Sequence, residues 1–480
     1  MKKMKKLASL LLAMIMVFAM SATAFAAEAD LSGHTYNAYQ IFEGTQAENE
    51  SALGEIDWGD GVDGEKLLIE LKKNTAFANC TSAEAVAEVL ATYGDKSEGA
   101  EAFAKVAYKF IIEGKGKNIG DSLEAGYYLV VDETTFEDGA TNTAVNLALL
   151  QLTKKGQFTI ENKTDVPEVV KKVKDTNDTA GTTTDWQDSA DYDIGDEVPF
   201  QLTATLASNV TDYDTYKVVF HDTLSAGLDY KEGSVVVKMG NQDVTSYFTP
   251  TESNGTLTIS CENVKKFGAT NSSVIVVEYI AFLDTDAVIG SAGNPNTVYL
   301  EYSNNPNWNG EGTPTGKTPT DKVIVFTYKL DFNKVDENQN PLAGAEFKLE
   351  KFVNGAWVEV VNKLTLDTTG TIFTFTGLDD GQYKLTETKA PNGYNIGSPL
   401  EFVITAEHNV TADEPTLISL TGDKVTGTAS TGTLLTTVIN QKGATLPETG
   451  GMGTTLFYVA GFAMMITAAG AFVARRRMTF

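Results

Sequence analysis

Two long stretches of this sequence, 167–302 and 323–442, consist of short runs in which apolar and polar residues alternate. Gly, Asn and Asp separate the runs, and neither stretch contains a long segment with helical spacing. Side chains along a strand point alternately to opposite faces, so the pattern is typical of half-buried strands joined by turns. We predict two β-sandwiches of immunoglobulin-like type. Residues 304–320, rich in Pro, Gly and Asn, are predicted to link them.

A different pattern precedes these modules, between residues 28 and 160. Thr81 and Glu84 fit a helix-capping box, and apolar residues follow at helical spacing. Residues 103–111 repeat that spacing, whereas the apolar-rich runs 126–131 and 145–152 are predicted to be strands. The chain is therefore predicted to be mainly β, with an N-terminal α+β domain before tandem sandwiches.

The composition excludes several classes of function. Acidic residues outnumber basic ones by 64 to 37, which gives a formal net charge of −27. Such a surface repels phosphate backbones, so we expect no nucleic-acid partner. Two cysteines, Cys80 and Cys261, and three histidines leave little material for a disulfide framework, a metal centre or a histidine-based triad. We therefore expect no cofactor and no metal.

Both ends of the chain carry patterns typical of processing signals. Residues 1–26 combine four lysines, an apolar core and an Ala-Phe-Ala cleavage site, which predicts a secretory signal peptide. At the other end, an LPETG motif precedes an apolar run, 456–474, that is long enough to cross a bilayer, and then three arginines. The motif consists of Leu446, Pro447, Glu448, Thr449 and Gly450.

Charged and amide side chains fall on the apolar faces of predicted strands. Burying one unpaired charge is costly, so a single case suggests a register error or a lysine reaching water at a strand end. Here each sandwich has a complete set of one lysine, one acid and one asparagine. Two such sets favour a chemical function over a register error or a lysine that reaches water. The sets are Lys171, Asp222 and Asn296 in the first sandwich, and Lys334, Glu387 and Asn440 in the second.

Such a set permits an intramolecular amide bond. Desolvation lowers the pKa of a buried lysine and raises the pKa of a buried acid. The neutral amine is then a nucleophile held against the carboxamide carbon of the asparagine. The protonated acid can polarise the carbonyl and shuttle protons while ammonia leaves. The neutral product removes the cost of burying the charges.

The LPETG motif, with its apolar run and basic end, resembles the cell-wall sorting signal of Gram-positive surface proteins. In that family a sortase cleaves between the Thr and the Gly, here Thr449 and Gly450. It then passes the Thr carbonyl to an amine on the cell wall or on another protein.

The body resembles the backbone (major) pilin subunits of Gram-positive sortase-assembled pili. PEVVKKV, VFHDTLSAGL and NTVYLEYSNNP resemble a CnaA-type D2 domain, and NKVD, LTETKAPNGY and VINQKG resemble a CnaB-type domain. The resemblance implies two isopeptide bonds, each with its own catalytic acid. These are Lys171 to Asn296 with Asp222 as catalyst, and Lys334 to Asn440 with Glu387 as catalyst.

Some alternatives remain open. Strand parity favours Lys171 over Lys172, and Asn304 and Asn305 are neighbouring alternatives to Asn296. No lysine lies near the start of the first domain, so we expect no bond of this kind there.

Backbone pilins polymerise through a lysine that follows the first domain, often in a YPKN context. In this sequence IENKTDVP occupies the place, so the resemblance makes Lys163 the expected acceptor, although the Tyr and Pro of the motif are missing. Lys154 and Lys155 are competing candidates, and an ordinary linker lysine is the alternative for Lys163.

The predicted organisation has five parts. They are a signal peptide (1–26), an N-terminal pilin domain (27–163), a CnaA-type D2 domain (164–322), a CnaB-type domain (323–445), and the sorting signal with its membrane segment and basic tail (446–480).

Three functions follow as hypotheses. The first is the shaft subunit of a covalently polymerised, cell wall-anchored pilus, in which Thr449 is joined to Lys163 of the next subunit. The second is a wall-anchored adhesin or minor pilin that is not polymerised. The third, an extracellular enzyme, lacks a catalytic set. For the first, the implied partners are a class C (pilus) sortase, identical subunits and peptidoglycan, with minor pilins and host surface ligands as further candidates.

Overall fold

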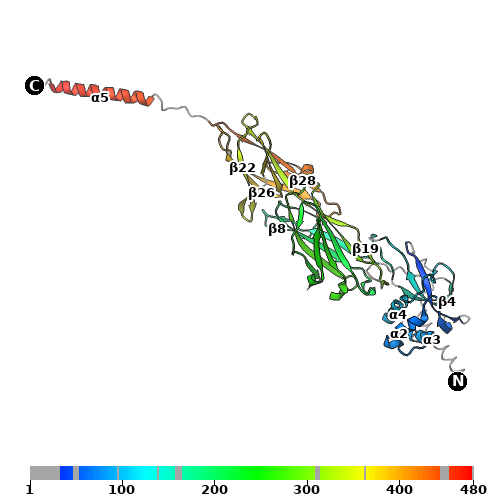
Figure 1. The fold of residues 1–480 in the computed structure, drawn as a ribbon. Coiled ribbons are helices and arrows are strands. Elements are labelled where there is room, and N and C mark those ends of the chain that lie inside the picture. The colour runs from blue at the N-terminus through cyan, green and yellow to red at the C-terminus, as the bar shows by residue number, and fades with distance from the viewer. Residues whose placement is uncertain are drawn as a thin grey trace.

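The computed structural model describes residues 33–46, 53–93, 97–137, 140–146, 148–156, 165–308, 314–361, 364–443 and 453–477. The predicted signal peptide, Lys163 and the LPETG motif lie outside these residues. Figure 1 shows three modules that follow one another in chain order along one elongated body.

The N-terminal module packs helices against one face of a sheet (Figure 1). The strands run in the order β2-β1-β4-β5, and β3 pairs with β1. Ile41, Leu129 and Val131 of the sheet share a core with Val86 and Phe103 of the helices. The elements are β1 (Tyr36–Gln46), β2 (Leu53–Trp58), α2 (Gly64–Leu71), α3 (Ala83–Leu90), α4 (Glu98–Tyr108), β3 (Lys117–Asn118), β4 (Leu123–Asp132) and β5 (Leu149–Gly156).

The predicted start of the first helical segment is wrong by one residue. The N-cap of α3 is Ser82, whose Oγ accepts a hydrogen bond from the N–H of Ala85, and not Thr81. Serine and threonine cap equally well in a sequence pattern, and the backbone places Ser82 at the extended position that capping needs. The second helix, α4, begins earlier than predicted because Ser97 caps it.

The middle module is a sandwich of two sheets. One has the order β14-β13-β17-β10-β6 with β12 beside β17, and the other has the order β15-β16-β11-β18-β20-β9 with β19 beside β18. Inward-facing residues such as Phe200, Val277 and Leu300 fill the space between them. The strands are β6 (Glu168–Val173), β9 (Ser189–Asp191), β10 (Glu197–Thr205), β11 (Val218–Leu224), β12 (Leu228–Tyr230), β13 (Val236–Met239), β14 (Gln242–Asp243), β15 (Thr249–Ser253), β16 (Thr256–Cys261), β17 (Val274–Leu283), β18 (Asn294–Ser303), β19 (Thr315–Lys317) and β20 (Asp321–Phe326).

The third module is a smaller sandwich with sheets β24-β25-β21-β30-β29 and β23-β22-β26-β27-β28. Its first strand, β21, and its last strand, β30, lie side by side and run parallel. The strands are β21 (Tyr328–Asp336), β22 (Glu346–Val353), β23 (Ala356–Glu359), β24 (Leu364–Leu366), β25 (Ile372–Leu378), β26 (Gly381–Lys389), β27 (Leu400–His408), β28 (Leu417–Gly422), β29 (Thr426–Thr428) and β30 (Thr433–Asn440).

Smaller elements complete the description. A two-stranded hairpin, β7 (Thr176–Asn177) and β8 (Thr182–Thr183), leaves the middle module. Short 3-10 turns lie at Thr75–Phe77, Val210–Asp212, Thr245–Tyr247, Val264–Phe267 and Ala429–Thr431.

The prediction of a mainly β chain with tandem modules is confirmed, but two details differ. Within the segment predicted as a linker, β19 pairs with β18 and Lys317 exchanges backbone hydrogen bonds with residues of the N-terminal module. The last strand of the middle sandwich is β20, which ends at Phe326, beyond the predicted boundary at residue 322. Both segments are held by ladder hydrogen bonds that composition alone does not reveal.

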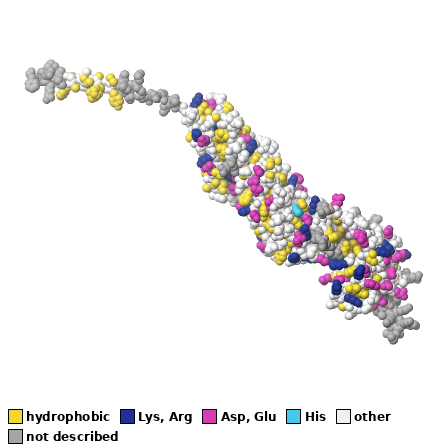
Figure 2. Space-filling view, in the orientation of Figure 1, with side chains coloured by type: hydrophobic (Ala, Val, Ile, Leu, Met, Phe, Trp, Pro, Cys, Tyr) yellow, Lys and Arg dark blue, Asp and Glu magenta, His cyan; other side chains and the backbone are white. Residues whose placement is uncertain are grey.

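The surface seen in Figure 2 differs between the modules and the C-terminal helix α5 (Gly453–Arg477). Acidic and basic side chains are interspersed over the N-terminal module, whereas α5 exposes hydrophobic side chains such as Phe457 and Phe462. Across the described ranges of the chain, no helix is both long enough and apolar enough to span a membrane.

Candidate functional site

Strand register brings Lys334 and Asn440 to one place in the third module. On the parallel pair β21–β30, Lys334 lies opposite Val438 and Asp336 lies opposite Asn440. Residues two apart on neighbouring strands share a face, so both side chains enter the core diagonally from one another. Lys334 is fully buried and Asn440 nearly so.

Glu387 reaches the same point from the opposite sheet, on β26. The Nδ2 of Asn440 donates to both carboxylate oxygens of Glu387, at 2.8 and 2.9 Å. The backbone N–H of Gly397 donates to Oε2 at 2.7 Å, which fixes the carboxylate against the loop that follows β26. The Oδ1 of Asn440 is buried, and no hydrogen-bond partner for it exists among the described residues.

The lysine is held in an environment that favours its neutral form. The Nζ of Lys334 donates only to backbone carbonyls in the bonds seen here, those of Val335 at 3.0 Å and Val438 at 3.3 Å. Burial lowers the pKa of Lys334 below its ordinary value, although the nearby charge of Glu387 opposes the shift. A neutral amine beside a carboxamide can act as a nucleophile.

The middle module assembles its set from both sheets. Lys171 comes from β6, at the edge of one sheet, while Asp222 and Asn296 come from the paired strands β11 and β18 of the other. Leu224 lies opposite Asn296, so Asp222 is the diagonal neighbour of Asn296 on the same face. All three members of the set are completely buried.

Tyr279 on β17 completes this site and was not predicted. The Nζ of Lys171 donates to Oδ2 of Asp222 and to the hydroxyl of Tyr279, the latter at 3.0 Å. The hydroxyl donates to Oδ1 of Asp222 at 2.9 Å and accepts from Nδ2 of Asn296 at 2.7 Å. The Oδ1 of Asn296, like that of Asn440, is buried without a hydrogen-bond partner in the part of the chain described.

Burial shifts both ionisable members of the middle site toward neutrality. It lowers the pKa of Lys171, against the attraction of Asp222. It raises the pKa of Asp222, against the attraction of Lys171. Because a buried ion pair is costly to desolvate, the neutral amine and the protonated acid become accessible together.

The structure distinguishes among the alternative residues. Lys172 is partly exposed and pairs with Asp188, which is buried, and not with Asp222. Asn304 lies beyond the opposite end of β18, where its carbonyl accepts from Val145 of the N-terminal module. Of the candidates, Lys171 and Asn296 are the pair that lies beside Asp222.

A third buried lysine shows the opposite chemistry. Lys351 of the third module donates to Asp379 of the same module, and to Asp193 (2.8 Å) and Asp178 (3.3 Å) of the middle module. Burial alone would lower the pKa of Lys351, but the charges of Asp379 and Asp193 raise it above the ordinary value. This lysine therefore stays an ammonium and joins the two modules as an ion cluster.

The same junction contains the residues best placed to hold a metal. Ligand atoms of Asp178, Asp193, Asp196 and Asp379 lie within 4.8 Å of one another, and so do those of a second group, Asp175, Asp191 and His408. The ammonium of Lys351 already lies among the first group. We therefore assign no metal there.

His408 links the modules in the second group. Its Nδ1 lies 2.7 Å from the hydroxyl of Ser189, and its Nε2 lies 3.4 Å from Asp175 and 3.5 Å from Asp191. Burial would lower the pKa of His408, but hydrogen bonds and charge from both carboxylates raise it to about 9. Positive charge on His408 thus balances carboxylates of the middle module.

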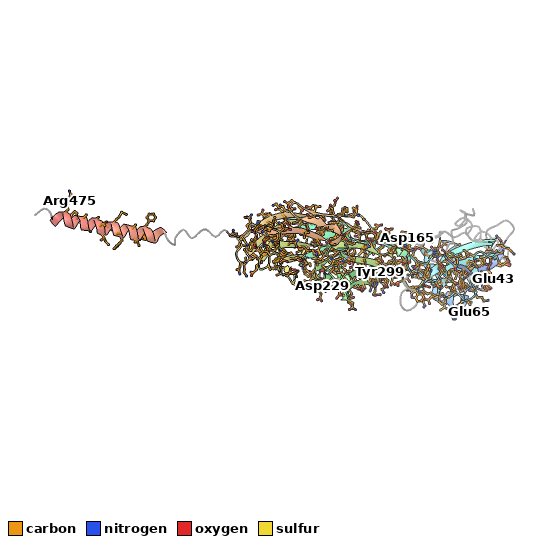
Figure 3. All side chains as sticks on the ribbon, turned by 90° about the horizontal axis from the view of Figure 1, so that it is seen from above. Glu43, Glu65, Asp165, Asp229, Tyr299 and Arg475 are labelled. Atoms are coloured by element: carbon orange, nitrogen blue, oxygen red, sulfur yellow. The ribbon has the colours of Figure 1, made fainter. Side chains whose placement is uncertain are left out.

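For the residues expected to join subunits, the structure describes only sequence neighbours. Lys163 and the LPETG motif lie outside the described residues, as noted above. Asp165, two positions after Lys163, lies where the middle module meets the N-terminal module (Figure 3). Its carboxylate accepts from the N–H groups of Val166 and Ser208. Lys155 on β5 is exposed and pairs with Glu124 at 3.0 Å.

Two matches to known families define the class of protein. Residues 328–416 match the SpaA prealbumin-like fold domain, and residues 439–478 match the LPXTG cell wall anchor motif. The chain is thus a cell wall-anchored surface protein of a Gram-positive bacterium, and its LPETG motif is a sortase substrate.

Two comparisons, one of sequence and one of structure, find similarity over most of the chain. The trypsin-resistant surface T6 protein of Streptococcus pyogenes serotype M6 is 26% identical over 391 residues, 66% of this chain and 70% of that protein. The solved T6 backbone pilin of serotype M6, described as a modular three-domain structure, matches with a TM-score of 0.53 at 19% identity, over 86% of this chain and 96% of that one. These similarities confirm the predicted resemblance to backbone pilins.

Proposed function

We propose that this protein is the repeating shaft subunit of a covalently polymerised, wall-anchored pilus. The observation that carries the proposal is the complete Lys–acid–Asn set buried in each of two tandem modules of a chain with a cell wall anchor motif. A buried lysine, acid and asparagine offer little net stability as they stand. They are well suited to becoming a neutral covalent crosslink.

In each sandwich the lysine amine attacks the side-chain carbonyl carbon of the asparagine. The new Nζ–Cγ bond replaces the Cγ–Nδ2 bond, and the nitrogen leaves as ammonia. In the third module Glu387, whose two carboxylate oxygens both accept from Nδ2 of Asn440, takes a proton from the amine and returns one to the leaving nitrogen. The acid is regenerated, so the reaction needs no cofactor.

The positions of the two bonds suit a structure under tension. Force applied at Thr449 enters the third module through β30 and crosses to β21 at the Asn440–Lys334 bond, so residues 335–439 bear none of it. In the same way, the Lys171–Asn296 bond keeps the pulling force off residues 172–295. Neither of these two stretches can then unravel under load unless a covalent bond breaks.

Assembly uses a different amide bond, formed by a pilus sortase between Thr449 of one subunit and Lys163 of the next. In the sequence Lys163 stands between β5, which ends at Gly156, and β6, which begins at Glu168, so the segment that connects the two modules supplies the acceptor amine. One donor and one acceptor per subunit give an open head-to-tail filament. The last subunit is transferred to peptidoglycan.

An immunoblot of cell-wall extracts with antibody against residues 27–449 tests the proposal. A ladder of high-mass bands that survives boiling in detergent supports a polymer. A single band at the monomer mass would instead assign the chain to the wall-anchored adhesins or minor pilins.

A further inference from the structure

The two crosslinking sites differ in how the acid reaches the asparagine. Glu387 receives hydrogen bonds directly from Nδ2 of Asn440. The acid of the middle site is an aspartate, whose side chain is one methylene shorter. There, Nδ2 of Asn296 donates to the hydroxyl of Tyr279 at 2.7 Å, and that hydroxyl donates to Asp222 at 2.9 Å. The phenol therefore fills the gap that the shorter acid leaves.

The resulting hydrogen bonds connect the two reacting nitrogens without interruption. Lys171 Nζ contacts Oδ2 of Asp222, Oδ1 of Asp222 contacts the Tyr279 hydroxyl, and the hydroxyl contacts Nδ2 of Asn296. The hydroxyl also lies 3.0 Å from Nζ itself. One oxygen atom thus touches both the nucleophile and the leaving group. Lys171, Asp222 and Asn296 are fully buried and Tyr279 is 2% exposed, so the path lies inside the core.

We propose that Tyr279 is a catalytic residue of the middle module, which passes a proton from Asp222 to the departing nitrogen of Asn296. This inference rests on the proposed crosslinking function. The inference adds a catalytic residue to the middle module. The third module needs no equivalent residue, because Glu387 contacts Nδ2 of Asn440 directly.

The proton transfers balance along this path. In the first step Nζ of Lys171 gives a proton to the Tyr279 hydroxyl, which gives its own proton to Oδ1 of Asp222, so that a neutral amine and a protonated acid result. Attack on Cγ of Asn296 leaves positive charge on Nζ and negative charge on the carbonyl oxygen. Asp222 accepts a proton from Nζ at Oδ2 while it gives one from Oδ1 to Tyr279, and Tyr279 gives its own proton to Nδ2. The Cγ–Nδ2 bond then breaks and ammonia leaves; Tyr279 again carries one proton, and Asp222 keeps the proton that it took from the Lys171 ammonium.

The surroundings of Tyr279 hold it in place for this role. Its ring stacks on Phe200 with the centroids 5.4 Å apart, and Tyr230 packs edge-on at 6.1 Å. Burial and the neighbouring carboxylate raise the pKa of Tyr279 well above its ordinary value. The phenol therefore keeps its proton until the leaving nitrogen needs it.

The test is the Tyr279→Phe variant of the secreted body, followed by intact-mass spectrometry and peptide mapping over time. The ring packing survives this change, and only the hydroxyl is lost. We expect the Lys171–Asn296 bond to form at least about 100-fold more slowly, the usual effect of losing a positioned proton-transfer group. The Lys334–Asn440 bond forms normally in the same molecules and serves as the internal control. Tyr230→Phe, which leaves the site's hydrogen bonds intact, should behave as wild type.

A rescue variant separates proton relay from mere packing. In Asp222→Glu/Tyr279→Phe the longer acid can contact Nδ2 of Asn296 directly, as Glu387 contacts Asn440, so we expect bond formation to recover at least tenfold over Tyr279→Phe. Measurement on the monomer fraction from size exclusion restricts the comparison to folded protein. Bond formation at the wild-type rate in Tyr279→Phe, or no recovery in the double variant, overturns the role of Tyr279 while leaving the proposed function intact. An intact Asn296 in the wild-type protein would overturn both.

Discussion

Lys334 and Asn440 lie on the first and last strands of the third module, and these strands run side by side in the same direction. Because the strands are neighbours, the two side chains meet in the core although 106 positions separate them. A bond between them closes nearly the whole module into a loop. Parallel pairing of the terminal strands thus places the two residues where the proposed covalent link would enclose almost the entire sandwich.

Removing the amine of Lys334 should destabilise the third module. Lys334→Met keeps most of the buried stem but cannot form the bond. By analogy with a disulfide closing a loop of this size, the free energy of unfolding should fall by about 4 kcal/mol. Thermal unfolding and limited proteolysis of the secreted body measure the effect.

The control is Lys348→Met, at a partly exposed site paired with Glu350. It should change the unfolding free energy by less than about 0.5 kcal/mol. Equal melting of Lys334→Met and wild type would contradict a stabilising crosslink.

The junction between the middle and third modules should weaken as the pH rises. The folded-state pKa of His408, about 9, exceeds the ordinary value of 6.5. Its protonation therefore stabilises the folded junction fully below pH 6.5, and this contribution disappears as the pH approaches 9. The shift corresponds to roughly 3 kcal/mol at most. The pKa of Asp175, raised by burial to about 6, lies below this range, so that carboxylate is already charged.

Unfolding of the secreted body at pH 7 and pH 9 measures the dependence. The transition that includes the third module should shift downward at pH 9 in wild type, and His408→Gln should remove most of the difference. A wild-type transition that is unchanged between the two pH values would show that His408 does not carry a linked proton.

Assembly should depend on Lys163. Lys163→Ala removes the proposed acceptor amine, so the high-mass ladder should disappear while a folded, wall-attached monomer remains. Lys155→Ala is the matched control, since Lys155 is an exposed lysine before the same connector. A ladder that persists in Lys163→Ala and disappears in Lys155→Ala would move the acceptor to β5, and mapping of the branched peptide would identify it.

Sequence pattern placed both Lys–acid–Asn sets on inward faces, as the structure does, because strand parity is a strong constraint. Lys334, Glu387 and Asn440 each occupy a position on the apolar face of their strand. Because side chains alternate with a period of two, that position must point into the core. Tyr279 gave no such signal, because an inward tyrosine in the run VIVVEYIAFL is indistinguishable from ordinary core. Its importance arises from hydrogen bonds to residues of three other strands, which only the packed structure shows.

The junction cluster was missed for a related reason. Lys351 alternates with apolar residues on β22, but its carboxylate partners come from turns and from another module. The segment 304–320 was misjudged because its Pro, Gly and Asn content suggested a linker. In the structure β19 forms part of a sheet, and Asn307 bonds to Asn146 and Ala148 of the N-terminal module. Contacts between modules depend on how the modules pack against one another, which local amino-acid composition does not reveal.

Intact-mass spectrometry of the secreted body, residues 27–449, tests the central claim most directly. The account predicts a mass lower than that of the sequence by two molecules of ammonia. Glu387→Ala should restore one of them and Asp222→Ala the other, and peptide mapping should join Lys334 to Asn440 and Lys171 to Asn296. A wild-type mass equal to that of the unmodified sequence would contradict the account, because the two buried sets would then be ordinary polar cores.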